Sequence, residues 1–363
     1  MFDFTEKLNF HEDKVNEALK DQIGSSLSTV FLDLLTNICN FNCSFCDGKT
    51  LYNLEDNSFS KARLDKMAEE LKQLHIDSVI LVGEGGEPLI HPYFAAFSKK
   101  LLKAGIKLGI YTNGSIVRKS ILTTLANFDF VRVSLNSGTK HSHELIHRYS
   151  SKNTFENVLK FIAECSKLNK NSVGVSFVII RENIEELYLA AKIAKECGAD
   201  YIEFKPAYGF NYSIDKKLYE TNIKRLLEQI EQSKTLETDR FKIVLNNQLH
   251  HFINNDFETN VDRITLLESP RACITSKLRM VVSPTGCYLC TPKRSMKHFS
   301  FGNPKVQSLV DIWYSKEHQA LINEPCSYKC TYHEQNNKLL EIKASGHAFT
   351  ANSNLSAHQK SFL

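Results

Sequence analysis

Short apolar runs alternate with amphipathic helical patterns from residue 29 to about residue 206. The segment 61–74 shows the helical pattern, because its apolar residues fall on one face. Gly105 and Gly198 each end a helical pattern just before an apolar run, as helix-terminating glycines do. The predicted strands are residues 29–35, 78–83, 130–136 and 173–180, and two more that end at Thr112-Asn113-Gly114 and near Pro206. Strands separated by helices of this length pair in parallel through right-handed crossovers.

The strand count limits the architecture further. Six strands by residue 205 are too few for a closed eight-stranded barrel. The glycine-rich and polar loops follow the carboxyl ends of these strands, which is the face where α/β barrels carry their active sites. The sequence therefore predicts an α/β fold, a partial (β/α)6 TIM-type barrel open at one side.

A different pattern begins after the barrel. Residues 273–290 read as a strand, a Pro-x-Gly turn and a second short strand, which predicts a hairpin. One helix is expected over residues 310–325, and Cys-Ser-Tyr-Lys-Cys follows it at 326–330. The extension is thus a small cysteine-rich hairpin and helix. The predicted divisions are a polar N-terminal segment 1–27, the barrel 28–235, the extension 236–344 and a flexible tail 345–363.

Composition restricts the surroundings and the partners. The formal charge is only +4 and the basic residues are spread along the chain, so no nucleic acid or membrane partner is expected. No run approaches the roughly 18 apolar residues of a membrane helix, and the N-terminus lacks a signal-peptide pattern. We therefore expect a cytoplasmic protein with reduced thiols, in which grouped cysteines indicate metal ligation.

The first cysteine group lies in the loop after the first strand. Cys39, Cys43 and Cys46 follow a C-x3-C-x2-C spacing with no fourth cysteine nearby. Three thiolates on a [4Fe-4S] cluster would leave one iron open for chemistry, whereas structural zinc takes four ligands and usually C-x2-C pairs. Spacing favours the cluster and leaves zinc as the alternative.

These cysteines, together with the Gly-Glu-Gly-Gly-Glu-Pro loop after the second strand, resemble the radical S-adenosylmethionine (radical SAM) superfamily over residues 28–210. The resemblance implies that Cys39, Cys43 and Cys46 hold a [4Fe-4S] cluster and that SAM binds its fourth iron. It implies cleavage of SAM to a 5′-deoxyadenosyl radical, which removes a hydrogen atom from a substrate. The positions that match SAM contacts in the family are Phe45, Gly85, Gly86, Glu87, Pro88, Ser134, Asn136, Val178 and Arg181.

The later cysteines resemble the SPASM or twitch extension of a branch of that superfamily, which carries auxiliary iron-sulfur clusters. Five cysteines are present here against seven in the full form, which implies one auxiliary [4Fe-4S] cluster. Its expected ligands are Cys273, Cys290, Cys326 and Cys330, and Cys287 is left as an alternate ligand, a hydrogen-atom donor or a hairpin side chain. A four-cysteine zinc site that uses Cys287, Cys290, Cys326 and Cys330 is the alternative.

The expected activity is oxidation or rearrangement of a small molecule or sugar-derived intermediate. The segment before the first strand is too short for a leader-binding domain, which favours this substrate class over a ribosomally made peptide. A peptide maturase that forms crosslinks is the second reading, and a non-catalytic zinc protein is the third. An electron donor such as flavodoxin or ferredoxin is expected. His91, Lys205, His298 and His333 are candidates for acid or base work, but none is assigned as catalytic.

Overall fold

The computed structural model describes most of the chain, namely residue 8 and residues 11–20, 24–46, 57–149, 154–168, 171–207, 216–254, 264–294, 296–330 and 332–346. These residues fall into two compact units. One contains residues 39–46 and 110–254, and the other contains residues 8–38, 57–109 and 264–346. The tail predicted to be flexible lies, from residue 347 onward, outside the described residues.

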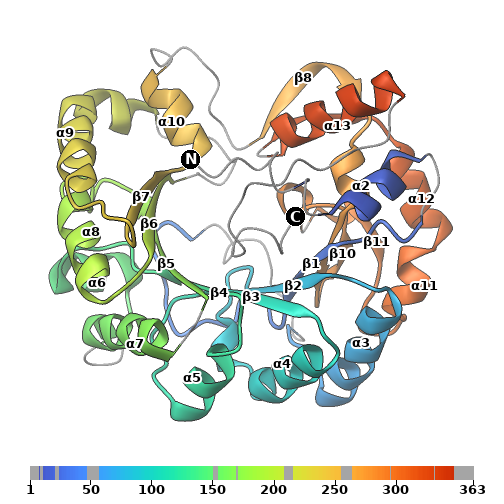
Figure 1. The fold of residues 1–363 in the computed structure, drawn as a ribbon, viewed down its shortest axis with the longest axis horizontal. Coiled ribbons are helices and arrows are strands. Elements are labelled where there is room, and N and C mark those ends of the chain that lie inside the picture. The colour runs from blue at the N-terminus through green and yellow to red at the C-terminus, as the bar shows by residue number, and fades with distance from the viewer. Residues whose placement is uncertain are drawn as a thin grey trace. The chain divides into compact units, whose positions relative to one another are not determined.

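In the second of these units the first barrel strand forms the centre of a sheet (Figure 1). Strand β1 (Thr29–Asp33) pairs in parallel with β2 (Ser78–Val82) and with β9 (Arg279–Ser283). Strand β9 then turns back as an antiparallel hairpin with β10 (Gly286–Tyr288), and β10 pairs with β11 (Ser300–Gly302). Every residue of β1, β2 and β9 is buried, as expected for strands covered on both faces.

Helices α3 (Lys61–Gln73) and α4 (Phe94–Lys103) lie below β1 and β2 in Figure 1. Helix α3 begins at Ser60, whose side chain accepts a hydrogen bond from Arg63 N and so caps the helix. It buries Leu64, Met67, Ala68 and Leu71, the face that the sequence predicts. The short helix η3 (Pro88–Ile90) lies between β2 and α4.

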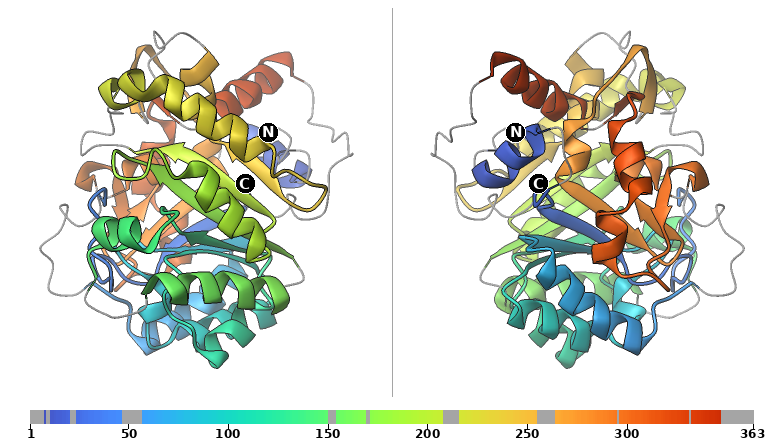
Figure 2. Two further views of the ribbon diagram at one scale, coloured as in Figure 1. Left: turned by 90° about the vertical axis from the view of Figure 1, so that its left-hand side faces the viewer. Right: turned by 90° about the vertical axis from the view of Figure 1, so that its right-hand side faces the viewer.

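The other unit carries the later barrel strands, all parallel. They are β4 (Phe130–Ser134), β5 (Ser172–Ile179), β6 (Tyr201–Pro206) and β7 (Lys242–Leu245), paired in that order. The helices are α5 (Lys119–Leu125), α6 (Lys140–His147), α7 (Thr154–Leu168), α8 (Leu187–Glu196), α9 (Lys216–Lys234) and α10 (Asn247–Asn254). Helices α8 and α9 pack side by side, as the left view of Figure 2 shows.

Strands β4 and β6 alternate between buried and half-exposed residues. Their buried side chains are apolar, whereas Arg132, Ser134, Glu203 and Lys205 lie on the half-exposed face. A parallel sheet with two covered faces would be apolar on both. One face of this sheet is therefore polar and partly accessible.

The α/β fold with parallel strands is confirmed, and the sheet is not closed into a barrel. All six predicted strands are present, with β3 at Lys107–Thr112. The segment around residues 241–245, with its apolar run, forms the additional parallel strand β7. The expected hairpin also forms, and its first strand β9 extends the parallel pairing of β1.

The extension differs from expectation in two places. The single helix predicted over residues 310–325 is two helices, α11 (Leu309–Trp313) and α12 (Lys316–Asn323). The break occurs at Ser315, whose side chain accepts from His318 N and starts the second helix. Residues 326–330 form strand β12 (Cys326–Cys330), which pairs antiparallel with β8 (Ile264–Arg271).

The N-terminal helix α2 (Glu12–Leu19) packs against the extension rather than lying free. Its Val15 and Ala18 belong to a buried apolar cluster that joins three parts of the chain. The other members are Leu8, then Ile274 and Leu278 around the short helix η4 (Ile274–Lys277), and Leu339 of α13 (His333–Ser345). The right view of Figure 2 shows α2 beside α13.

The predicted boundaries between barrel and extension stay a prediction. Among the described residues, none of the helices has the length and apolar character needed to cross a membrane.

Candidate metal centres

The three-cysteine loop presents half-buried thiols with hydrogen-bond donors directed at one of them. The backbone N–H of Phe41 lies 3.4 Å from Cys39 Sγ, and the Asn113 side-chain nitrogen lies 3.8 Å from the same sulfur. Asn113 is held in place because its Nδ2 also donates to Asn40 Oδ1 at 2.9 Å. Such N–H groups stabilise a thiolate, which is the form that binds iron.

The end of helix α6 fixes the shape of this loop. Asn42 N and Ser44 N donate to the carbonyl oxygens of His147 and Ile146, both at 2.8 Å. The buried Phe41 ring packs on His147, with 4.9 Å between ring centroids. The loop is therefore positioned by backbone hydrogen bonds and by an apolar anchor at its centre.

His147 contacts a second cysteine of the loop. Its Nε2 lies 3.2 Å from the Leu135 carbonyl oxygen. Because a carbonyl oxygen can only accept a hydrogen bond, Nε2 carries the proton of the neutral ring. The unprotonated Nδ1 then accepts a hydrogen bond from the Cys43 thiol, with 3.0 Å between nitrogen and sulfur. Burial lowers the pKa of His147 to about 4. Burial, with the adjacent His147 ring as the smaller cause, lowers the pKa of His143 to about 3. Both rings are thus neutral, and neither was among the residues predicted from the sequence. The i, i+4 spacing of the two histidines in α6 was the available signal.

Phe45 is half-buried and meets the His147 ring edge-on, with 6.2 Å between centroids. It therefore lies on the same loop and against the same helix as Cys43. Its predicted contact with the adenine of SAM stays a prediction.

The Gly-Gly-Glu-Pro segment forms a tight turn after β2. Gly85 has a left-handed backbone (φ 62°), which glycine adopts without strain. A Cβ on Gly86 would lie 2.5 Å from Leu35 Cδ1 and 2.9 Å from the Leu35 carbonyl oxygen.

Glu87, the next residue of the turn, is buried. Its backbone N–H donates to Ile38 O at 2.9 Å, and its carboxylate accepts from Leu89 N at 3.0 Å. Pro88 begins the short helix η3. The turn is packed directly against the residues that precede Cys39.

Two asparagines link the ends of β4 and β5. Asn136 has a left-handed backbone (φ 53°), and its Oδ1 accepts from Val178 N at 2.8 Å. Asn183 Nδ2 donates to the carbonyl oxygens of Asn136 (2.9 Å) and Val178 (2.8 Å). Val178 and Ser134 are half-exposed on the polar face, whereas Arg181 is exposed to solvent. Asn183 was not predicted, because only the tertiary fold shows that its amide bridges two strand ends.

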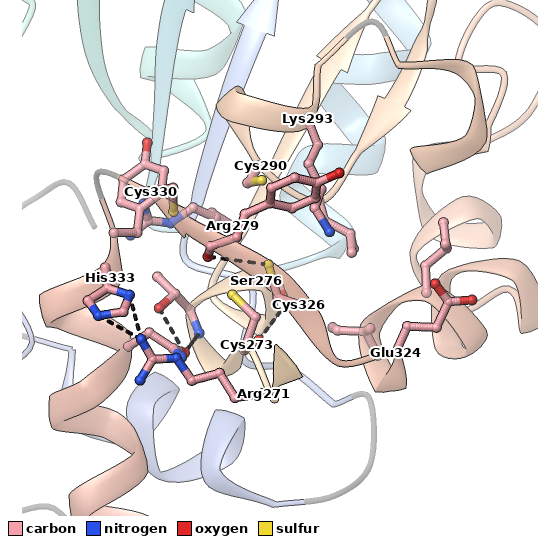
Figure 3. Close-up of a pocket in the computed structure, with 17 residues that line it drawn as sticks. Arg271, Cys273, Ser276, Arg279, Cys290, Lys293, Glu324, Cys326, Cys330 and His333 are labelled. Carbon is pink, nitrogen blue, oxygen red and sulfur yellow. Dashed lines mark hydrogen bonds between the residues drawn. The ribbon is translucent and has the colours of Figure 1, made fainter. Parts of the chain in front are cut away.

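The second centre is a pocket in the extension. Four cysteines line it, as Figure 3 shows: Cys273, Cys290, Cys326 and Cys330. Cys273 and Cys290 precede the short helices η4 and η5 (Thr291–Lys293), and Cys326 and Cys330 are the two ends of β12. Burial raises the pKa of the Cys273 and Cys290 thiols, and that of Cys330 to about 11. These thiols would ionise only beside a compensating positive charge.

Cys287 does not reach this pocket. It is fully buried in β10, and the charged groups that act on its thiol are Arg63 and Glu70 of α3. Cys287 therefore lies in the hairpin strand β10, outside the residues that line the pocket, and the alternative zinc site that includes it stays a prediction. In the part of the chain that the structure describes, no three His, Cys, Asp or Glu side chains lie close enough to share one metal ion.

The candidate acid and base residues have structural partners or are exposed. His91 is buried, and its Nε2 lies 3.0 Å from the Phe59 carbonyl; burial lowers its pKa. His298 is exposed beside Phe299, and His333 lies against Arg271. Lys205 lies on the half-exposed face of β6, opposite Val178. Of the four, only Lys205 lies on the polar sheet face.

Comparison with known proteins agrees with these features. The family model of the radical SAM superfamily matches residues 34–194. The tungsten-containing aldehyde ferredoxin oxidoreductase cofactor-modifying protein of Pyrococcus furiosus is 23% identical over 306 residues, which cover 78% of this chain and 80% of that protein. A probable GTP 3′,8-cyclase of Sulfurisphaera tokodaii is 29% identical over 236 residues, which cover 61% and 68% of the two chains.

Among solved structures, Streptococcus suis SuiB bound to S-adenosylmethionine matches with a TM-score of 0.61 and 17% identity, over 82% of this chain and 68% of SuiB. At this identity the likeness concerns the fold, a partial barrel with an open parallel sheet. The matched segment of the radical SAM superfamily model covers less than half of this chain, and the solved structures agree with it in fold. A [4Fe-4S] cluster and SAM are the cofactors that this superfamily implies.

Proposed function

We propose that this radical SAM enzyme holds its SAM-binding [4Fe-4S] cluster through Cys39, Cys43 and Cys46. The observation that carries the proposal is the pair of N–H donors, from Phe41 and Asn113, directed at Cys39 Sγ. They suit a thiolate ligand better than a neutral core thiol. When bound, the cluster and SAM supply a 5′-deoxyadenosyl radical that removes a hydrogen atom from the substrate.

For SAM itself, we propose contacts from residues of four loops. Gly85 and Gly86 allow close approach of the methionine end, Glu87 accepts from its ammonium group, and Pro88 fixes the turn. Phe45 and Val178 contact the adenine. Ser134 and Asn136 bind the ribose. The side-chain oxygen of Asn136 already accepts a hydrogen bond from Val178 N, so its amide nitrogen is the group that would bind the ligand. The exposed Arg181 binds the carboxylate.

In the extension, we propose that Cys273, Cys290, Cys326 and Cys330 hold one auxiliary [4Fe-4S] cluster. Four thiolates on a single zinc ion, with bonds of about 2.3 Å, must lie within about 4 Å of one another. Thiolates on a four-iron cluster each bind a different iron and lie farther apart. Cysteines that line one pocket without meeting the spacing of a single ion fit the cluster better.

The test of the auxiliary site uses Cys287 as its matched control. We expect anaerobically purified protein to contain about eight irons per chain, and Cys326→Ala/Cys330→Ala to contain about half of that. Cys287→Ala should keep the full iron content, because Cys287 is not among the residues that line the pocket. Iron content and the visible absorption spectrum measure this. Loss of half the iron in Cys287→Ala, with full iron in the double variant, would contradict the ligand assignment.

For the substrate, we propose oxidation or rearrangement of a polar small molecule. The polar face of β4 and β6 supports this, because Arg132 pairs there with Glu203, and Lys205 lies on the same face. The names of the two curated relatives, a cofactor-modifying protein and a GTP cyclase, point to the same class. A flavodoxin or ferredoxin is the proposed electron donor.

A peptide substrate is the second candidate. The observation that favours it is SuiB bound to its precursor peptide SuiA, which this chain matches with a TM-score of 0.62 at 16% identity, over 85% of this chain and 69% of SuiB. Incubation of the reduced enzyme with SAM and cell-extract fractions separated by size distinguishes the two classes. Consumption of a compound in the low-mass fraction supports the first, and consumption only in the peptide fraction supports the second.

A further inference from the structure

Arg279 is a buried cation with unused hydrogen-bond donors. It lies in β9, is 2% exposed, and is among the largest fully buried side chains of the described residues. Its Nη2 donates to Gln335 Oε1 at 2.8 Å, and its guanidinium lies 3.9 Å from the centroid of the Tyr332 ring. Its Nε and Nη1 have no hydrogen-bond partner within the described chain.

A guanidinium in this state is expensive to bury. A neutral amide and an aromatic face only partly replace the water that it loses, and an uncompensated buried charge costs several kcal/mol. Within the described ranges, Arg279 has no carboxylate partner. The unpaired N–H groups on Nε and Nη1 therefore favour an anionic partner.

The place where such a partner would bind is the four-cysteine pocket. Arg279 lines it together with Cys273, Cys290, Cys326 and Cys330 (Figure 3). Its positive charge acts on Cys273 and Cys330 and opposes part of the effect of burial on their thiols. Lys293 adds a second positive charge on the Cys290 side, with its Nζ 3.9 Å from the Phe299 ring centroid.

We propose that Arg279 donates hydrogen bonds to the sulfur atoms of the auxiliary cluster and raises its reduction potential. A four-iron cluster with four thiolate ligands carries net negative charge, and its potential depends on hydrogen bonds to sulfur, nearby charge and solvent exposure. Arg279 supplies the first two of these from a dry site. This inference rests on the proposed function, because it requires the auxiliary cluster.

The test is a potentiometric titration of the auxiliary cluster, followed by electron paramagnetic resonance, in full-length protein. A Cys43→Ala background removes the SAM-binding cluster, so that the remaining signal belongs to the auxiliary site. In this background we expect Arg279→Met to lower the ratio of reduced to oxidised auxiliary cluster at least tenfold at a fixed potential. For a one-electron couple this corresponds to a reduction potential lower by about 59 mV. Arg279→Lys keeps the charge but not the fork of donors, and should shift the ratio less.

Arg271→Met is the matched control. Arg271 also lines the pocket, but it is half-exposed and lies 2.6 Å from His333 Nε2, so that solvent screens its charge. We expect a shift well below that of Arg279→Met. Equal shifts in the two variants, or a wild-type potential in any iron-loaded Arg279 variant, would overturn the proposal.

Two further outcomes separate this inference from the proposed function. If the Cys43→Ala protein with Arg279 intact contains no iron, the auxiliary cluster itself is refuted. If Arg279→Met loses iron while Arg279→Lys keeps it with a lowered potential, the charge and donor roles are both supported. Loss of iron in both variants, with unchanged circular dichroism, would assign Arg279 to cluster assembly instead and overturn the effect on potential.

Discussion

At the scale of single residues, the charges buried at the ends of β1 and β2 are the most informative feature. Asp33, at the end of β1, is fully buried, and Glu84, just after β2, is 6% exposed. Arg294 lies between them, with its Nη1 3.3 Å from Asp33 Oδ1 and its Nε 3.2 Å from Glu84 Oε2. One guanidinium thus forms ion pairs with two carboxylates. Because its single positive charge cannot balance two negative charges, one of the carboxylates is favoured in its protonated form.

Burial is the main cause that raises the pKa of Asp33, to about 7; Arg294 opposes the rise, and Glu84 adds to it. Tyr288 also lies within electrostatic reach of both carboxylates. A raised pKa means that the folded protein holds a proton that the unfolded chain releases near pH 3.8. The stability contributed by this proton is complete below pH 3.8 and is lost as the pH rises towards 7.

We therefore predict that Asp33→Asn flattens the pH dependence of stability. The amide imitates the protonated carboxyl, so that the variant should not lose stability between pH 5 and pH 8 as the wild type does. The full effect of a change from 3.8 to about 7 is of the order of 4 kcal/mol. Thermal unfolding followed by circular dichroism measures it. Parallel pH profiles for the two proteins would show that Asp33 is ionised throughout.

At the scale of elements, the turn after β2 depends on a glycine for steric reasons. A Cβ on Gly86 would meet two carbonyl oxygens, Leu35 O at 2.9 Å and Ile38 O at 3.3 Å, and backbone atoms cannot rotate away. We predict that Gly86→Ala displaces the turn and weakens SAM binding at least tenfold, measured by equilibrium dialysis with iron-loaded protein.

Gly105→Ala is the control for this prediction. Gly105 also has a left-handed backbone (φ 82°), but no atom lies within 4 Å of its Cβ position. The strain of about 1 kcal/mol should lower stability and leave SAM affinity unchanged. If Gly86→Ala bound SAM as tightly as Gly105→Ala, the turn would have no part in SAM binding.

Elements with a strong local pattern could be predicted from the sequence, and the others could not. Helix α3 and strand β2 carry a clear apolar period and appear as expected. Strand β12 depends on pairing with β8, a segment some sixty residues earlier, and local periodicity does not report such a partner. The break between α11 and α12 depends on the cap formed by Ser315, which the continuous apolar pattern concealed.

The same division holds for the candidate sites. Cysteine spacing and the Gly-Gly-Glu-Pro turn were visible in the sequence because their residues are close along the chain. Arg279, Asn183 and His147 were missed, because each acts through a partner brought near by the tertiary fold. Their importance comes from burial and from what their donors and acceptors face, which a single sequence does not show.

At the scale of the whole molecule, the chain combines an α/β fold and its open parallel sheet with a cysteine-lined extension that the N-terminal helix helps to hold. Helix α2 contributes to the apolar cluster around η4, and η4 directly follows Cys273. The first and last described parts of the chain therefore support one of the proposed cluster ligands.

The formation of 5′-deoxyadenosine from SAM tests the central claim most directly. We predict that anaerobic, iron-loaded protein produces 5′-deoxyadenosine when it is given dithionite and SAM, and that Cys43→Ala produces none above the level of a protein-free control. Chromatography with mass detection measures the product. A colourless, zinc-loaded protein that forms no 5′-deoxyadenosine, or a Cys43→Ala variant with wild-type turnover, would contradict the account.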